Sequence, residues 1–210
     1  MKYVLILLIM STPYSIQKSN AQTTIMEKQA IIIPKIDNSF ETFDIKTFNK
    51  EKRLSKRMKK ESEILIEEDS YTTGFIRRTY SDSSYFKYNK LFYKSLGIKK
   101  KGVMFNDGSK YGIWYEFDEQ GNLIETIDTD AGYDFTWEQV IHYCEENKIK
   151  LIKGYKRSGF KTKIYKEESE EGNKIWVITY QISGDQLIEL TLDGKTGEEL
   201  KRKEIGFINH

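Results

Sequence analysis

Three aspartates in one short stretch are the residues that most suggest metal chemistry. Asp128, Asp130 and Asp134 fall within seven consecutive residues. Hard cations such as Ca²⁺ prefer clusters of carboxylate oxygens, so calcium is one expectation for this stretch. The spacing is not that of an EF-hand loop, and the glutamate that would bind through both oxygens is missing. The alternative is that Asp134 only favours the start of the helix expected after it.

The sequence contains few residues that could act in nucleophilic catalysis or bind zinc. Cys144 is the single cysteine, and the two histidines are His142 and His210. On a helix, residues two positions apart point about 200° away from each other, so His142 cannot act as a base for Cys144 within one helix. A typical zinc site also needs more cysteines or histidines. We expect Cys144 to be a buried structural residue and the protein to be neither an enzyme nor dependent on a cofactor.

One catalytic alternative stays open. The 32 Asp and Glu residues must include close pairs, and a pair of carboxylates is what glycoside hydrolysis requires. A phosphate-binding loop at Gly194-Lys195-Thr196 is rejected, because Glu189 stands where that motif requires its first glycine.

An aromatic stretch is the candidate binding surface. Tyr111, Trp114, Tyr115 and Phe117 lie in one expected strand and could contact a sugar or a peptide. Neighbouring residues of a strand point to opposite faces, so Trp114 and Tyr115 cannot both contact one ligand. Ordinary packing in the core is the favoured alternative for at least one of them.

The N-terminus has the features of a secretory leader. Residues 1–21 contain Lys2, an apolar run at 3–10 and the small residues Ser19 and Ala21 before an expected cleavage. The apolar run is shorter than the roughly 20 residues needed to cross a bilayer. We therefore expect a periplasmic or secreted protein with no transmembrane segment in its mature chain.

Charge limits the classes of partner that we expect, and the cysteine content limits the disulfides that can form. The full chain has 34 Lys and Arg against 32 Asp and Glu, and Lys2 and Lys18 both belong to the expected leader. A mature chain without net charge has no general attraction for nucleic acid, so a nucleic-acid partner is not expected. A single cysteine also excludes a disulfide within the chain.

Composition shifts divide the rest of the chain. Residues 22–70 are expected to be an arm followed by a charged helix or linker, because the basic run at 46–60 precedes an acidic block. Residues 71–132 are expected to form an antiparallel β meander. Its clearest turn is Asn106-Asp107-Gly108, where glycine tolerates a positive φ.

The last part, residues 133–210, is expected to be one helix and then a sheet. Thr136 and Gln139 fit a capping box, and Trp137 to Cys144 show helical apolar spacing. Strands are expected at 149–152, 161–166, 174–182, 186–192 and 199–205.

Two segments resemble known families. Residues 111–123, with Gly112, Trp114, an aromatic pair and a turn containing Gly121, resemble a MORN-variant repeat, and 91–98 resemble a weaker copy. Such repeats are β-hairpins that imply a contact surface. Residues 137–144, 175–178 and 192–200 are similar to a PepSY-like domain, although a turn like the one at 193–197 also occurs in β-propeller blades. The PepSY-like resemblance implies an extracytoplasmic binding or inhibitory module without a catalytic set.

The expected fold class is α+β: an antiparallel meander, then a helix plus three- to four-stranded antiparallel sheet. The two β regions could share one sheet or form two. The expected function is binding of a protein or peptide through a β surface. The alternatives are an inhibitor or immunity protein and a hydrolase with an unrecognised carboxylate pair. The sequence does not indicate the oligomeric state.

Overall fold

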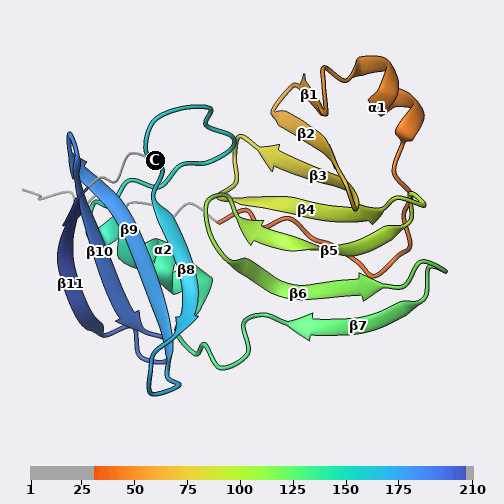
Figure 1. Cartoon of the computed structure of the whole chain (residues 1–210). Helices are drawn as coiled ribbons and strands as arrows, with labels where there is room; N and C mark the ends of the chain where they lie inside the picture. Colours follow the sequence, from red (N-terminus) through yellow and green to blue (C-terminus); the bar gives the residue numbers. More distant parts are fainter. Residues whose placement is uncertain (1–30, 207–210) are drawn as a thin grey trace, which may run out of the picture. The chain divides into compact units, whose positions relative to one another are not determined.

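The computed structural model describes residues 31–206, which form two antiparallel sheets and two helices (Figure 1). The expected leader, the cleavage after Ala21, residues 22–30 and His210 lie outside the described residues. The elements are, in chain order, α1 (Ile45–Glu51), β1 (Lys56–Glu61), β2 (Ile64–Tyr71), β3 (Gly74–Ser81), β4 (Phe86–Tyr93), β5 (Ile98–Phe105), β6 (Lys110–Phe117), β7 (Leu123–Asp128), α2 (Trp137–Glu146), β8 (Lys163–Glu168), β9 (Lys174–Ser183), β10 (Gln186–Asp193) and β11 (Glu199–Gly206). The expected α+β architecture is confirmed.

The first sheet is a meander of seven strands in the order β1 to β7, each antiparallel to the next. Short polar turns reverse the chain between strands. At the turn from β6 to β7, Asp118 Oδ1 accepts the backbone N–H of Asn122 at 2.8 Å, and Gly121 adopts a φ of +89°. This topology makes β1 and β7 the two edges of the sheet. Among the described residues, no helix is both long enough and apolar enough to span a bilayer.

The expectation of a charged helix or linker before residue 71 holds for Ile45–Glu51 and is wrong for residues 56–70. The helix α1 ends at Glu51, and residues 56–71 form the strands β1 and β2, so the meander begins at Lys56. The basic run and the acidic block are opposite strands of one hairpin, and their charges neutralise each other across it. Arg57 pairs with Glu68 at 2.7 Å, and Lys56 pairs with Glu67. Each block alone is so strongly charged that its pattern is typical of solvated surface, which is why the sequence does not predict the hairpin.

The segment before α1 is bound to the sheet by charge. Lys101 on β5 is fully buried, and its ammonium contacts Glu41 at 2.7 Å, Asp37 at 3.4 Å and the Ser39 carbonyl at 2.6 Å. A buried ammonium is stable only with such partners. The segment 37–41 is therefore fixed across one face of the meander.

The second sheet has the order β11-β10-β9-β8, and the helix α2 packs against it. The predicted capping box is confirmed, because Thr136 Oγ1 accepts from the Gln139 N–H and the Gln139 side chain accepts from the Thr136 N–H. The helix ends at Glu146, and Asn147 is its C-cap, as expected. No strand forms at 149–152: Ile149 is buried in the core there, and the first strand of this sheet is β8.

An aromatic cluster joins the two sheets, which are separate and not continuous. Trp137 of α2 stacks on Phe105 of β5 with ring centroids 5.4 Å apart and meets Trp176 of β9 edge-on at 4.7 Å. The Trp176 Nε1–H donates to the Phe135 carbonyl at 3.0 Å. Because these rings come from both sheets, the meander and the second sheet share one hydrophobic core.

The turn between β5 and β6 forms as predicted, but its glycine is needed for another reason. Gly108 is not among the residues with positive φ. Instead, the turn lies against β8: the Ser109 N–H donates to the Ile164 carbonyl at 3.0 Å, and the Ile164 N–H donates to the Asp107 carbonyl at 3.2 Å. A Cβ on Gly108 would lie 1.9 Å from the Ile164 oxygen. Only glycine permits this close approach of two backbones.

Gly108→Ala should therefore destabilise the fold. Because backbone atoms must move to admit the new methyl group, we expect a loss of about 1–3 kcal/mol in the free energy of unfolding, measured by urea denaturation. Gly206→Ala is the matched control, because a Cβ there meets no atom within 4 Å. Equal stabilities of the two variants would contradict the proposed role of Gly108.

Candidate functional site

Strand β7 is an edge whose outer backbone is unpaired, since it pairs only with β6 (Figure 1). The Thr129 N–H donates to the Gly112 carbonyl at 3.0 Å, which fixes the phase of the hydrogen bonds between the two strands. Bonded and non-bonded pairs alternate along an antiparallel ladder. The backbone groups of Glu125 and Ile127 therefore point toward β6, and those of Thr126 point away from the sheet.

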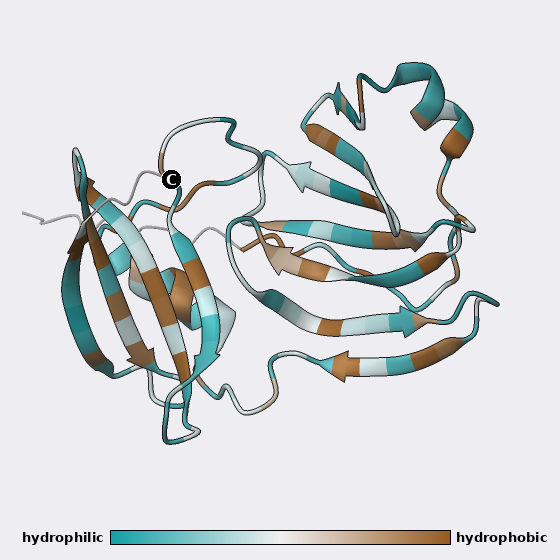
Figure 2. Cartoon of the chain, viewed as in Figure 1, coloured by the Kyte–Doolittle hydropathy of each residue, from teal (hydrophilic) through white to brown (hydrophobic). Residues whose placement is uncertain are grey.

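Exposed apolar side chains accompany this edge. Leu123 and Ile124 on β7 are 41% and 62% exposed, and Ile113 on the neighbouring β6 is 39% exposed. Figure 2 colours both ends of β7 as hydrophobic. Apolar side chains beside unpaired backbone groups are the combination that another extended chain can bind.

The other three sheet edges have features that hinder such pairing. The edges β1 and β11 carry exposed basic residues, among them Lys59 and Lys60 on β1 and Lys201 and Lys203 on β11, and lysine on an edge opposes strand addition. The edge β8 is covered by the turn that bonds to Ile164. The edge β7 has neither a lysine nor a covering segment among the described residues.

The predicted aromatic surface is corrected by the structure. Trp114 and Phe117 are each only 2% exposed and cannot contact a ligand. The Trp114 ring lies over Gly102, and its Nε1–H donates to the Val103 carbonyl at 2.9 Å. Phe117 belongs to the hydrophobic cluster of Phe43, Phe48, Phe92 and Ile98. The alternative weighed from the strand geometry, core packing, is confirmed for these two residues.

Tyr111 and Tyr115 remain partly exposed and line an apolar groove of about 480 Å³. The opposite wall of the groove is the segment from Ile33 to Ile36. Burial is the main cause of the raised pKa of Tyr111, about 12, so its phenol stays protonated at neutral pH. Half of the predicted aromatic set thus lies at an accessible surface.

The predicted calcium site does not form. No group of three or more metal-binding side chains occurs in the described part of the chain. Asp130 pairs with the Lys166 ammonium at 2.5 Å and accepts the Gly112 N–H at 2.9 Å, while Asp128 Oδ1 accepts the Asp130 N–H at 2.9 Å. Asp134 takes part in none of these three contacts. A lysine ammonium thus takes the place of the expected cation.

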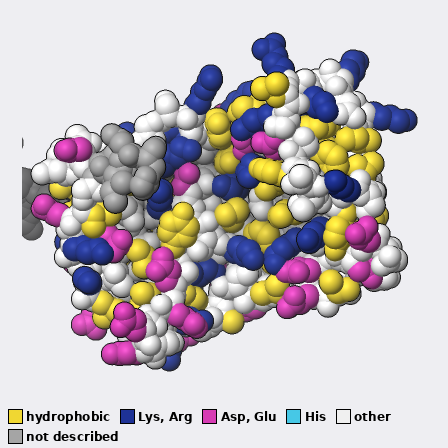
Figure 3. All heavy atoms as spheres, viewed as in Figure 1, with side chains coloured by type: hydrophobic (Ala, Val, Ile, Leu, Met, Phe, Trp, Pro, Cys, Tyr) yellow, Lys and Arg dark blue, Asp and Glu magenta, His cyan; other side chains and the backbone are white. Residues whose placement is uncertain are grey.

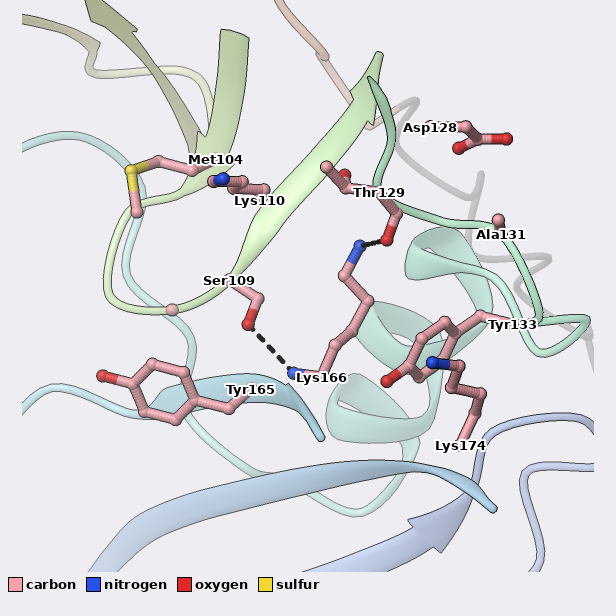
Figure 4. Close-up of a pocket in the computed structure, with 11 residues that line it drawn as sticks. Met104, Ser109, Lys110, Asp128, Thr129, Ala131, Tyr133, Tyr165, Lys166 and Lys174 are labelled. Carbon is pink, nitrogen blue, oxygen red and sulfur yellow. Dashed lines mark hydrogen bonds between the residues drawn. The ribbon is translucent and has the colours of Figure 1, made fainter. Parts of the chain in front are cut away.

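A cleft of about 610 Å³ lies between the meander and β8 (Figure 4). Lys166 crosses it: its N–H donates to Ser109 Oγ at 3.0 Å, and its ammonium donates to the Thr129 carbonyl. Tyr133, Tyr165 and Lys174 complete the wall on the side of the second sheet. The cleft begins where β7 ends and so adjoins the open edge.

Lys110 is the cation in this cleft without an acidic partner among the described residues. Burial lowers its pKa, and the charges of Lys100 and Lys166 lower it further. Its ammonium lies 4.7 Å from the centre of the Trp114 ring, a cation–π contact. Figure 3 shows Lys and Arg side chains gathered over the meander on the side drawn there. The cleft can therefore accept a negatively charged group.

His142 and Cys144 are placed as expected. Cys144 is fully buried in the core around α2, and His142 is partly exposed and pairs with Glu146 at 2.6 Å, one turn further along the helix. The segment 193–197 is the turn from β10 to β11: Asp193 Oδ1 accepts the backbone N–H groups of Lys195 and Thr196, at 2.9 and 2.8 Å. These contacts serve the fold.

Comparison of the chain with protein-family models, with curated proteins and with solved structures finds no match. The MORN-variant and PepSY-like resemblances stay expectations. Sequence reasoning missed the open edge of β7 because a strand at an edge reads like any other strand. The lack of lysine in residues 123–128 is no signal of an edge, because the interior strands β2, β3 and β10 lack lysine as well.

Cys144 should resist thiol reagents in the folded protein. Burial raises the pKa of its thiol to about 12, so roughly one molecule in ten thousand carries a thiolate at pH 8. We expect slow labelling by a disulfide reagent at pH 8 and full labelling within minutes in denaturant. Adding a second thiol by Ser183→Cys, at an exposed position, should give one fast equivalent. Rapid labelling of Cys144 in the folded natural protein would contradict its burial.

Proposed function

We propose that this chain is a non-catalytic, extracytoplasmic module that binds an extended segment of a partner protein along the outer edge of β7. The segment would add an eighth strand to the meander. Backbone hydrogen bonds would supply much of the affinity, and the exposed apolar side chains of β7 would add contacts.

One observation carries the proposal: β7 is the sheet edge left open. Edges β1 and β11 are lysine-rich, and edge β8 is bonded to the turn at Gly108. An open edge with exposed apolar residues favours aggregation unless a partner covers it. A binding role explains why residues such as Ile124 remain exposed on this strand.

The proposed export and the two proposed family resemblances rest on sequence features and on the order of the elements. The apolar run and small residues at 1–21 support export, and the helix-then-sheet order of 137–206 supports a PepSY-like module. The hairpin of β6 and β7 supports the MORN-variant resemblance.

An inhibitor or immunity protein would use the same edge and is the alternative function. A hydrolase gains no support from Glu168, the partner of the cleft residue Lys174: that contact lowers the pKa of Glu168, whereas a general acid needs a raised pKa.

Thr126→Pro tests the proposal directly. Proline removes the outward N–H of this residue and leaves the bonds between β6 and β7 in place, so the fold should persist while strand addition fails. We would capture partners from the envelope fraction of the native organism with the natural chain and with this variant. A protein retained by the first and lost by the second is the predicted partner.

Thr126→Val is the matched control, because valine keeps the N–H and the branched shape. It should retain the same partner as the natural chain. Equal capture by all three chains would mean that binding does not use the β7 edge, and the proposal would fail.

A further inference from the structure

Two glutamates face each other beside the open edge. Glu116 on β6 and Glu125 on β7 are register partners, so their side chains extend from the same face of the sheet. Glu116 is already paired with Lys100 on β5, its neighbour on the other side. Glu125 has no cationic partner among the described residues. Like charges directly opposite each other destabilise a sheet, and in this pair only Glu116 has a compensating charge.

Two other acidic residues of the meander, Glu67 and Glu68, are compensated by basic residues on both neighbouring strands. Glu68 on β2 lies between Arg57 and Arg77 and contacts them at 2.7 and 2.6 Å. Glu67 contacts Arg78 at 3.3 Å and also pairs with Lys56. Lys100 on β5, Glu116 on β6 and Glu125 on β7 form a row across three strands. This row differs because its last residue, on the edge strand, is an acid without a basic partner among the described residues.

The chain itself contains a like-charge row that an added segment neutralises. Lys90 and Lys101 are register partners on β4 and β5. Glu41, from the segment before α1, contacts Lys90 at 2.5 Å and Lys101 at 2.7 Å. An extended segment with the opposite charge therefore already compensates one such row.

We infer that the partner strand on β7 places a lysine or arginine beside Glu125. This inference rests on the proposed function and names the chemistry of its partner. For an antiparallel partner, the basic residue occupies a non-hydrogen-bonded position, because the backbone of Glu125 points toward β6. Side chains approach closely at such positions, which favours an ion pair.

The register also predicts a second residue of the partner. Ile127 lies two positions after Glu125 and points to the same face. In an antiparallel partner, the residue opposite Ile127 comes two positions before the basic residue. The partner segment should thus contain an apolar residue, any residue, and then Lys or Arg.

A charge swap at Glu125 provides the test. A displayed library of random ten-residue peptides is selected on the natural full-length chain and, separately, on Glu125→Lys. The variant should fold, because the introduced ammonium would face the carboxylate of Glu116, and its urea unfolding is measured first. Only peptides whose binding is lost on Thr126→Pro and kept on Thr126→Val are counted.

Peptides from the natural chain should be enriched in Lys or Arg two positions after an apolar residue. Peptides from Glu125→Lys should carry Asp or Glu at the same position. A basic peptide should bind Glu125→Gln roughly two- to five-fold more weakly than the natural chain. Edge-dependent peptides of the same composition from both selections would overturn the inference and leave the proposed function intact. A selection without edge-dependent peptides would overturn the proposed function, and the inference with it.

Discussion

The contact between the turn at Gly108 and Ile164 covers one of the four sheet edges in the described part of the chain. A strand edge is a row of unpaired donors and acceptors that must be covered, blocked or used. Hydrogen bonds that join Asp107 and Ser109 to Ile164 cover the edge of β8, and the missing side chain of Gly108 permits that approach. The same contact places β6 and the end of β7 beside the second sheet and forms one wall of the cleft. Edges β1 and β11 carry lysines, so among the described residues β7 is the edge with neither a covering segment nor a lysine.

Charge complementarity governs the rest of the meander. The sequence is about as acidic as it is basic, and the structure pairs these charges across strands and against the segment 37–41. Rows of opposite charge fix the register of strands whose apolar pattern is weak, such as β1 with Met58 as its only apolar residue. The uncompensated row that ends at Glu125 is an exception to this pattern, and it lies on the open edge.

The sequence predicts part of this structure for clear reasons. The capping box at Thr136 and the turn at Gly108 depend on neighbouring residues, so both are predictable. The pairing of β1 with β2 is not, because the charged residues Arg57 and Glu68 look solvated until their strands are brought together. Local patterns also do not reveal that Trp114 is buried.

Prediction of the candidate site from the sequence fails for the same reason: contacts between residues far apart in the chain decide it. The sequence predicts a metal at Asp130 because it contains no sign that Lys166, far along the chain, reaches this carboxylate. The aromatic residues can be identified from the sequence, but the face that each one occupies depends on the segment packed against the strand. The open edge is a property of the whole topology, and no local motif encodes it.

Amide hydrogen exchange along β7, measured by NMR, tests the central claim most directly. An open edge predicts that the N–H groups of Glu125 and Ile127, bonded to β6, exchange slowly, while the outward N–H of Thr126 exchanges rapidly. On addition of a bound partner segment, the Thr126 amide should become protected. A Thr126 amide that is already protected in the isolated chain would mean that the edge is covered, and it would contradict this account.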